Sequence, residues 1–423
     1  MASDRAGSTR RSFAPGSAGF TFVLSMAMAS TALSIDSVLP AFGDIREAFG
    51  LAPDSTAVAG LITAFIIGNA IGLLPAGLLA DRYGRRPVLW GGLALFIVGT
   101  AAAALAPTLG WMMAARFVWG LGSAGPRVAA MAMVRDAYEG ERMARQMSAI
   151  MAVFILVPAV APTLSTGLLA IGPWPIVYWM CAVAAVIAGG LSLRLPSTLP
   201  ADQRTALDAG ALLHSIRSVF AARGTTRYLI ALTMLQGAFY AYLGSTELIV
   251  DETFGLRSWL PVIFGVFALA MGMGMLINGR IVERVGLDRL IRYLFACYVA
   301  ASLVLAMIGV VTDGRPPFWL YALAAPPVLA FHGVLIPNLN SAAMRPLAHV
   351  AGVASALLGM IPGVFGALIG SRIDAAFDGT MRPLAFGFLG AGLVAAISTP
   401  VMYGSRLGPN RGDDVDPVTA VVE

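Results

Sequence analysis

Four charged side chains lie inside long apolar stretches of this 423-residue sequence: Asp36, Arg116, Arg127 and Glu247. A charge at the centre of a membrane helix costs roughly 2.5–3.5 kcal/mol on insertion scales, so each of these groups needs a partner, contact with water or a neutral form. Burial disfavours the charged form of a carboxyl group, which lets such a group exchange protons near neutral pH. These residue types therefore predict proton transfer or ligand binding within a membrane protein.

Helical geometry indicates which of these side chains lie close together. At 1.5 Å per residue, Asp36 and Arg116 each lie about 9 Å below the same membrane face, so an interaction between them is geometrically reasonable. A structural ion pair that only fixes helix packing is the alternative. Arg116 and Arg127 are about three turns apart and share a helix face. The small residues Gly120 and Ser123 lie between them, as expected for a cavity wall. For Arg127, packing against carbonyls freed by the preceding proline is the alternative.

A second polar face lies on a later helix and comprises Gln236, Tyr240, Gly244 and Glu247. An amide, a phenol and a carboxylate on one face suit an amphipathic ligand. Glu247 lies only about 4–5 Å from the end of its helix, so contact with interfacial water is the alternative for this residue. The sequence leaves open whether Asp36 or Glu247 carries the proton.

The overall composition is that of a membrane protein. Hydrophobic residues make up 58% of the chain and charged residues 12%, against about 45–50% and about 25% in soluble domains. Apolar runs of about 18 residues or more predict membrane helices. The predicted fold is therefore all-α, with twelve transmembrane helices near residues 18–42, 56–80, 87–106, 110–136, 146–171, 174–195, 228–250, 258–282, 288–312, 317–342, 350–375 and 381–405.

The residue types that are missing exclude several kinds of chemistry. All 28 basic residues are arginines, so the chain has neither a phosphate-binding loop with its lysine nor a Schiff-base lysine. The two cysteines and three histidines are scattered and offer no metal-ligand spacing. We therefore expect no enzyme activity, no metal and no cofactor. A proton gradient is the expected source of energy.

The arginines are distributed unequally between the two sides of the predicted membrane. With the N-terminus inside, 21 arginines fall on the cytoplasmic side and 5 on the other side. The positive-inside rule then makes both termini cytoplasmic. The net charge of +5 follows from this bias and indicates no nucleic acid. The predicted units are a tail 1–17, a six-helix half 18–195, a linker 196–227 with a short amphipathic helix, a six-helix half 228–405 and a tail 406–423.

A short motif occurs once in each half of the chain. The pattern G-x-x-x-[DE]-R-x-G begins at Gly77 in "GLLADRYGRR" and at Gly279 in "GRIVERVGLDR", 202 residues later (279 − 77). Each copy closes the second helix of its half. Two six-helix halves with a shared motif are typical of secondary transporters, whose halves move against each other around a site near the membrane midplane.

Several stretches resemble a known family. "GLLADRYGRRPVL" is similar to the signature loop of the major facilitator superfamily, and the resemblance covers nearly the whole chain. Within that superfamily, "DSVLPAF", "RFVWGLGSA" and "MVRDAYEGERMARQMS" resemble the twelve-helix drug:proton antiporters of the bicyclomycin/chloramphenicol resistance group. The antiporter motif of the fifth helix is incomplete. "VPAVAPTLSTG" keeps Pro158, Pro162 and Gly167 as a possible hinge but lacks the paired glycines.

The resemblance implies a role for the arginine-rich loop. In the superfamily this loop latches the cytoplasmic side in the outward-open state: its acid meets the eleventh helix of the other half, and charges at the end of the fourth helix complete a network. The residues at the matching positions are Gly77, Asp81, Arg82, Gly84, Arg85, Arg86, Arg135 and Asp136.

The resemblance also implies a function. We expect a proton-coupled exporter of small, mainly apolar or amphipathic compounds, acting as a monomer in a bacterial inner membrane. Its expected partners are the substrate, protons and the lipid bilayer. The cavity residues are Asp36, Arg116, Arg127, Gln236, Tyr240 and Glu247. A metabolite or organic-anion permease of the same fold is one alternative, and a non-transporting membrane receptor or scaffold is the second.

Overall fold

The computed structural model describes residues 13–204, 208–399 and 401–402, and these residues are helical without any β-strand. The predicted C-terminal tail and most of the predicted N-terminal tail lie outside this range. The helices of 17 residues or more are α1 (Ala18–Asp36), α3 (Gly60–Tyr83), α4 (Arg85–Ala104), α5 (Leu109–Ala137), α6 (Gly140–Leu169), α7 (Pro175–Ser192), α9 (Arg223–Leu248), α10 (Leu260–Val285), α11 (Leu287–Val311), α12 (Phe318–Met344), α13 (Ala351–Ala375) and α14 (Arg382–Ser398).

Length and composition make eight of the described segments candidate membrane spans, one of which joins α12 to α13. The prediction of an all-α membrane fold is confirmed, whereas the number of twelve crossings stays a prediction. The helices α5 and α9 are not among the eight candidates. Both carry polar side chains predicted to line a cavity, and such residues make a helix less apolar.

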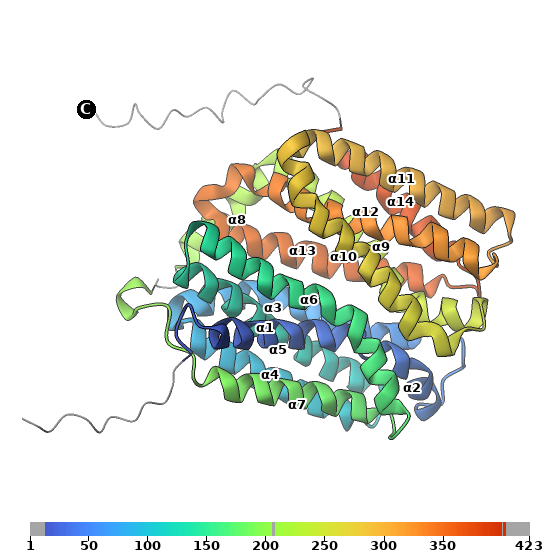
Figure 1. The fold of residues 1–423 in the computed structure, drawn as a ribbon, viewed down its shortest axis with the longest axis horizontal. Coiled ribbons are helices and arrows are strands. Elements are labelled where there is room, and N and C mark those ends of the chain that lie inside the picture. Colours follow the sequence, from blue (N-terminus) through green and yellow to red (C-terminus); the bar gives the residue numbers. More distant parts are fainter. Residues whose placement is uncertain (1–12, 205–207, 400, 403–423) are drawn as a thin grey trace, which may run out of the picture.

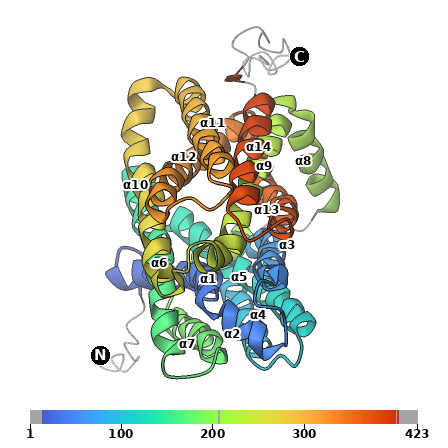
Figure 2. The ribbon, with the colours of Figure 1, turned by 90° about the vertical axis from the view of Figure 1, so that its right-hand side faces the viewer.

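The helices form two groups that follow the order of the chain. Helices α1 and α3 to α7 pack mainly on one another, and α9 to α14 do the same. The first group, blue to green, lies below the second, yellow to red, in Figure 1, and Figure 2 shows the same division from the side. The groups meet chiefly through α3 with α13 and through α6 with α10. The exact limits of the predicted halves stay a prediction.

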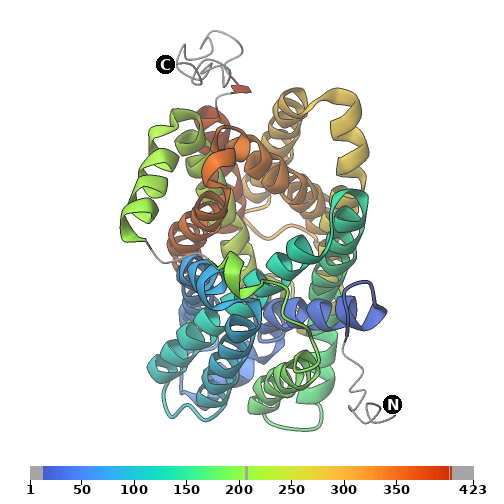
Figure 3. The same ribbon diagram turned by 90° about the vertical axis from the view of Figure 1, so that its left-hand side faces the viewer.

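The segment between the two groups is partly helical. The expected amphipathic helix is present as α8 (Ala209–Ala221), and it packs beside α9 and α13 (Figure 3). Helix α9 begins at Arg223, five residues before the predicted start of the second half at residue 228. Its first turn is polar and was therefore not recognised from hydropathy, although Thr225 Oγ1 donates a hydrogen bond to the Ala343 carbonyl at 2.9 Å.

The first helix is shorter than predicted. Helix α1 ends at Asp36, and the chain continues through η1 (Leu39–Ala41) into α2 (Phe42–Ala48). Pro40 has no N–H with which to bond the Asp36 carbonyl four residues earlier, so the α-helix cannot continue there. Asp36 is therefore the last residue of α1, where the last carbonyl groups of the helix are available to other partners.

Glycines allow several helices of the first group to pack at close range. A Cβ atom on Gly92 of α4 would lie 2.6 Å from Pro126 Cδ and 2.8 Å from the Gly122 carbonyl oxygen of α5. Gly120 of α5 approaches the Phe65 carbonyl of α3 even more closely. Small residues at helix contacts are a common means of association in membranes, because dispersion forces there require close approach.

Two adjacent glycines test this packing. We expect Gly92→Ala to destabilise the protein by about 1–3 kcal/mol, because the added methyl group clashes with backbone atoms of α5. Gly91→Ala is the matched control, since nothing lies within 4 Å of a Cβ at that position. Thermal unfolding of the two purified variants measures the difference. Equal melting temperatures would show that α4 and α5 are not tightly packed at Gly92.

Candidate functional site

An ion pair joins the two helix groups at the end of the bundle that lies away from loop 81–86. We call this the distal end and the other the arginine-rich end; in Figure 1 they are marked by α2 on the right and α8 on the left. Arg46 of α2 donates from Nη1 and Nη2 to the two carboxylate oxygens of Glu247, at 3.0 and 2.7 Å. The side chains are only 4% and 2% exposed. Arg46 Nε donates to the Ser55 carbonyl at 2.9 Å. Glu247 is therefore paired, and neither faces interfacial water nor stands free.

A pocket of about 530 Å³ lies beside this ion pair. Pro40, Asp44 and Thr166 of the first group and Glu247 and Arg257 of the second contribute to its wall. A weaker, exposed ion pair also crosses between the groups here, with 3.5 Å between Arg257 Nη2 and Asp44 Oδ1. Among the described residues, both ion pairs between the groups lie at the distal end.

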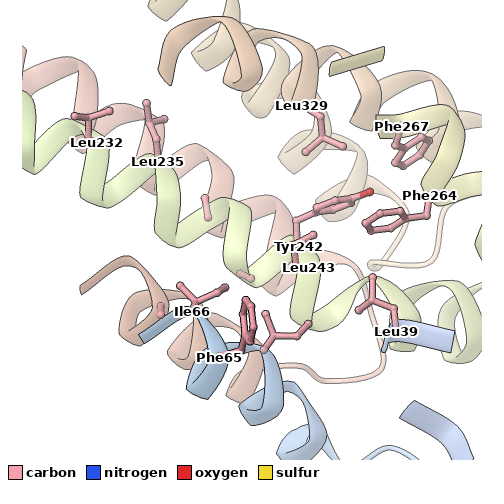
Figure 4. Packing of buried hydrophobic residues seen from close by; sticks show 14 of the residues in the cluster. Leu39, Phe65, Ile66, Leu232, Leu235, Tyr242, Leu243, Phe264, Phe267 and Leu329 are labelled. Atoms are coloured by element: carbon pink, nitrogen blue, oxygen red, sulfur yellow. The ribbon is translucent and has the colours of Figure 1, made fainter. Parts of the chain in front are cut away.

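Apolar side chains support the contact near the distal end. Leu39 of η1 and Phe65 of α3 belong to the same buried cluster as Tyr242 and Leu243 of α9. Figure 4 shows these side chains facing one another, with the Tyr242 ring stacked on Phe264 of α10. The ion pair is thus set beside a dehydrated contact between the groups, where it is poorly screened.

Arg116 does not pair with Asp36. Its Nη1 donates to the Ser34 carbonyl at 2.8 Å, and its Nε donates to the Leu61 carbonyl at 3.1 Å. The guanidinium also lies 4.8 Å from the Phe65 ring and 4.6 Å from the Trp119 ring. The Ser34 carbonyl is one of the last in α1 and has no partner within that helix. Arg116 does lie beside the end of α1, but its guanidinium contacts backbone and aromatic groups of α1, α3 and α5, and its Nη2 has no hydrogen-bond partner.

Asp36 is left without a cationic partner. Its side chain is buried, the residue being 5% exposed, and it makes no hydrogen bond or ion pair within the part of the chain that the structure describes. The Tyr242 hydroxyl of α9 is close enough to interact with it electrostatically. Asp36 therefore lies where the first helix breaks, facing the second helix group, with no group that holds its charge.

Arg127 is the second charged residue without a fixed partner. Its side chain is exposed although it lies ten residues from the end of α5, and no described side chain makes an ion pair with it. It interacts electrostatically with Tyr240 of α9 in the other group. Tyr240 accepts a hydrogen bond from Gln236 Nε2 at 3.0 Å. The predicted polar faces of α5 and α9 are thus opposed through these three residues.

The predicted wall between Arg116 and Arg127 is not open. Gly120 packs against the α3 backbone, and Ser123 is fully buried. Ser123 Oγ accepts a hydrogen bond from Asn69 Nδ2 of α3 at 2.7 Å and donates to the Gly120 carbonyl. This part of the face forms the α3–α5 contact, because small residues serve close helix packing as well as a cavity.

The arginine-rich loop forms its own network of charges. Arg85 bonds to Asp81 and, through Nε at 2.9 Å, to Asp136 at the end of α5. Asp136 also accepts a hydrogen bond from Thr198 Oγ1 at 3.0 Å. Arg135 is exposed and is not part of these bonds. The expected link between the loop and the end of α5 is therefore present through Asp136.

The other loop residues contribute to the turn and to its surface. Gly84 has a φ of +95°, and Gly286 in the second copy of the motif has +81°, so both glycines end a helix in a conformation that other residues avoid. Arg86 Nη2 donates to the Leu193 carbonyl at 3.2 Å and stacks over Trp90. Arg82 lies over the ring of Tyr83.

The described bonds of the loop stay within the first helix group. Asp81 bonds to Arg85 and is 56% exposed, and a Cβ atom on Gly77 would meet nothing within 4 Å. No ion pair or hydrogen bond with the eleventh long helix, α13, is formed by the described loop residues, so the latch stays a prediction. The described ion pairs between the two helix groups lie at the distal end.

The predicted hinge lies within an unbroken helix. Pro158 and Pro162 are inside α6, and Thr166 Oγ1 donates to the Pro162 carbonyl at 2.9 Å. A Cβ atom on Gly265 of α10 would lie 3.3 Å from the Ala159 carbonyl, so the backbone beside Pro158 contacts the other group. Gly167 has open space around it. Bending at these residues stays a prediction.

Sequence reasoning missed two polar residues, Arg46 and Asp374. Arg46 was counted only for topology, although 201 residues separate it from Glu247, almost the 202-residue repeat. Residues at equivalent positions of two halves can meet at the axis that relates them, so this offset was a usable signal. Asp374 of α13 is buried against Gly244 with its Oδ1 unbonded. His332 packs on Phe239, and its Nδ1 has no hydrogen-bond partner.

Comparison with known proteins identifies the family. The family model of the Major Facilitator Superfamily matches residues 22–371. The chain belongs to the Major Facilitator Superfamily. It is thus a multi-pass membrane protein of a transporter family. The family match confirms the relationship that the sequence of the arginine-rich loop indicated.

Curated relatives of this superfamily member include drug-resistance proteins. It is 25% identical to the "Bicyclomycin resistance protein homolog" of Haemophilus influenzae, over 93% of the chain and 98% of that protein. It is 36% identical to the "Multidrug resistance protein MdtL" of Escherichia coli O81, over 33% of the chain and 36% of that protein. A solved D-xylose-proton symporter shares the fold, with a TM-score of 0.71 at 12% identity, over 91% of this chain and 99% of that one.

We expect the main role of Arg116 to be stabilisation of the folded protein. Arg116→Ala leaves the Ser34 carbonyl at the end of α1 without a donor and removes a second bond to the Leu61 carbonyl of α3. Hydrogen bonds to a charged group each contribute about 1.5–3 kcal/mol. Arg116→Lys keeps the charge but loses the planar group that reaches both carbonyls and stacks on the rings. We therefore expect the melting temperature to be highest in the parent, lower in Arg116→Lys and lowest in Arg116→Ala. An unchanged melting temperature of Arg116→Ala with lost transport would instead support direct pairing with Asp36.

Proposed function

We propose that this protein is a proton-coupled exporter of small, mainly apolar or amphipathic compounds, such as drugs, in a bacterial inner membrane. The drug-resistance relatives support the class of substrate. The single observation that carries proton coupling is the buried Asp36 carboxyl group, which has no cationic partner and faces the other helix group. Glu247 is unsuited to the same role because Arg46 holds its charge.

The chemistry of coupling follows from the position of Asp36. An unpaired carboxylate in an apolar site is costly, and either a bound proton or contact with water removes that cost. Opening one end of the bundle hydrates Asp36 and releases its proton, whereas closure favours the protonated form. A charge that crosses the membrane supplies about 2.3 kcal/mol per 100 mV, so one inward proton supports a roughly fiftyfold substrate gradient.

Arg127, Gln236 and Tyr240 are the proposed ligand contacts. They come from α5 and α9, which belong to different helix groups, so a ligand between them contacts both. The free guanidinium of Arg127 also favours a second candidate function, the export or uptake of organic anions. Efflux of lipophilic dyes, compared with transport of a labelled organic anion in the parent and in Arg127→Gln, separates the two.

The direct test of the proposed function is a resistance panel. Cells that lack their own drug pumps and express this protein are expected to tolerate higher concentrations of several unrelated apolar antibiotics. Collapse of the proton gradient by an ionophore should abolish the gain. Unchanged tolerance across the panel, together with anion transport, would contradict drug export and favour the permease.

Asp36→Asn is expected to abolish proton-driven efflux while the protein still folds. The asparagine has nearly the same shape but cannot release a proton. Inverted vesicles with an imposed pH gradient and a fluorescent substrate measure the effect. Asp54→Asn is the control, since Asp54 is exposed at the distal end and should keep full activity. Full efflux in the Asp36 variant would remove this residue from the coupling step.

Asp81→Asn is expected to slow the conformational cycle and leave ligand affinity unchanged. We infer that Asp81 meets the N-terminus of α13 when the arginine-rich end closes, and such a contact contributes about 0.3–1 kcal/mol. Without it, the closed state of that end is less populated. Binding affinity and transport rate, measured separately, test this. A weaker affinity at an unchanged rate would contradict the latch.

A further inference from the structure

The two ends of the bundle differ in how the helix groups are held. At the distal end, η2 (Thr56–Ala59) lies against α9 and α13, and Arg46 and Glu247 form a buried ion pair between the groups. At the arginine-rich end, Arg85 binds Asp81 and Asp136 within the first group, and Arg345 binds Asp288 within the second. Within the described residues, ion pairs cross between the groups only where the bundle is closed.

We propose that the Arg46–Glu247 ion pair is the lock that holds the distal end closed during the transport cycle. This inference rests on the proposed function, because a lock has a role only if the two groups move apart at that end. Arg46 and Glu247 are then positioning residues: they act on the balance between conformations and not on the substrate.

Geometry favours this pair over the second pair that crosses between the groups. The guanidinium of Arg46 uses two nitrogens on two carboxylate oxygens, at 3.0 and 2.7 Å. Arg257 and Asp44 approach only to 3.5 Å and are 51% and 45% exposed. Exposed pairs contribute little because water screens them, whereas removal of one partner of a buried pair leaves an uncompensated charge.

The position of the lock also suits its role. Arg46 and Glu247 occupy nearly equivalent places in the two halves, 201 residues apart, and therefore lie near the axis between them. Separation of the groups at the distal end must pull these two residues apart. The pocket beside Glu247 provides the space through which water can reach both charges once they separate. Water then replaces the ion pair, so the open state is not left with bare charges in an apolar site.

The test uses a cysteine that is buried only while the distal end is closed. Ala59 is 4% exposed in η2, against the second group. The reporter variant carries Ala59→Cys, with Cys181 and Cys297 replaced, and its reaction rate with a water-soluble maleimide is measured on the purified protein in detergent. We expect Glu247→Gln to raise this rate about tenfold or more, because a buried arginine without its partner favours the hydrated open state.

A charge-swapped protein distinguishes a lock from a merely structural pair. Arg46→Glu and Glu247→Arg are each expected to open the distal end, and the double variant to return the labelling rate towards that of the parent. Asp44→Asn is the matched control on the same short helix, and it should change the rate less than about twofold, since its pair is exposed. An unchanged rate in Glu247→Gln, or a double variant as open as either single variant, would overturn the proposal.

Failure of the lock and failure of the proposed function give different results. If Glu247→Gln raises the labelling rate but no compound in the resistance panel is exported, the lock stands and the substrate class is wrong. If drugs are exported and the labelling rate does not respond, the exporter stands and the lock is wrong. If Glu247→Gln does not fold, a double variant that folds and labels like the parent still supports the pairing, and one that does not contradicts it.

Discussion

Charge within an apolar helix bundle must be neutralised, and this requirement governs the arrangement of the whole interior. Arg46 and Glu247 neutralise each other through two short bonds across the helix groups. Arg116 is satisfied by two carbonyls and two aromatic rings. Asp36 and Arg127 have no such fixed partner. Of the four charges within the predicted membrane helices, the buried Asp36 and the exposed Arg127 are therefore the two left free to exchange a proton or to bind a ligand.

This division gives the molecule separate parts for closure and for transport chemistry. The distal ion pair lies in a contact that is already dry, so the loss of either partner leaves an uncompensated charge there, whereas water replaces the pair once it enters. The arginine-rich network contains the same types of charge on a wetter surface, and here it is folded back on its own helix group. A transporter needs both ends to open, and contacts of modest net stability at each end allow neither conformation to dominate.

Much of the fold follows directly from the sequence. The apolar runs predict the long helices, and the repeated motif predicts the turns at Gly84 and Gly286, because both require a positive φ that glycine adopts easily. The break after Asp36 could also have been read from Pro40, which removes one helical hydrogen bond. The amphipathic pattern after residue 208 correctly predicts α8. Local rules were sufficient for these features because each depends on residues close together in the chain.

The contacts between distant segments were harder to predict. Arg116 was placed beside the end of α1, but this position alone could not distinguish the Asp36 carboxylate from the Ser34 carbonyl two residues earlier. Glu247 was recognised as a buried charge, while its partner belongs to a short helix in the other half. Gly120 and Ser123 have the small size that suits both a cavity wall and a tight helix contact, and only the packing of α3 decides between them.

The central claim is that the charge of Asp36 determines which end of the bundle is closed. Spin labels at Asp54→Cys and Ser258→Cys report the distal end, and labels at Arg142→Cys and Arg289→Cys report the arginine-rich end; all four positions are exposed. Pulsed electron resonance gives both distance distributions in the parent and in Asp36→Asn. The account predicts that the neutral side chain shifts the two distributions in opposite senses, one end widening as the other narrows. Unchanged distributions, or ends that widen together, would contradict it.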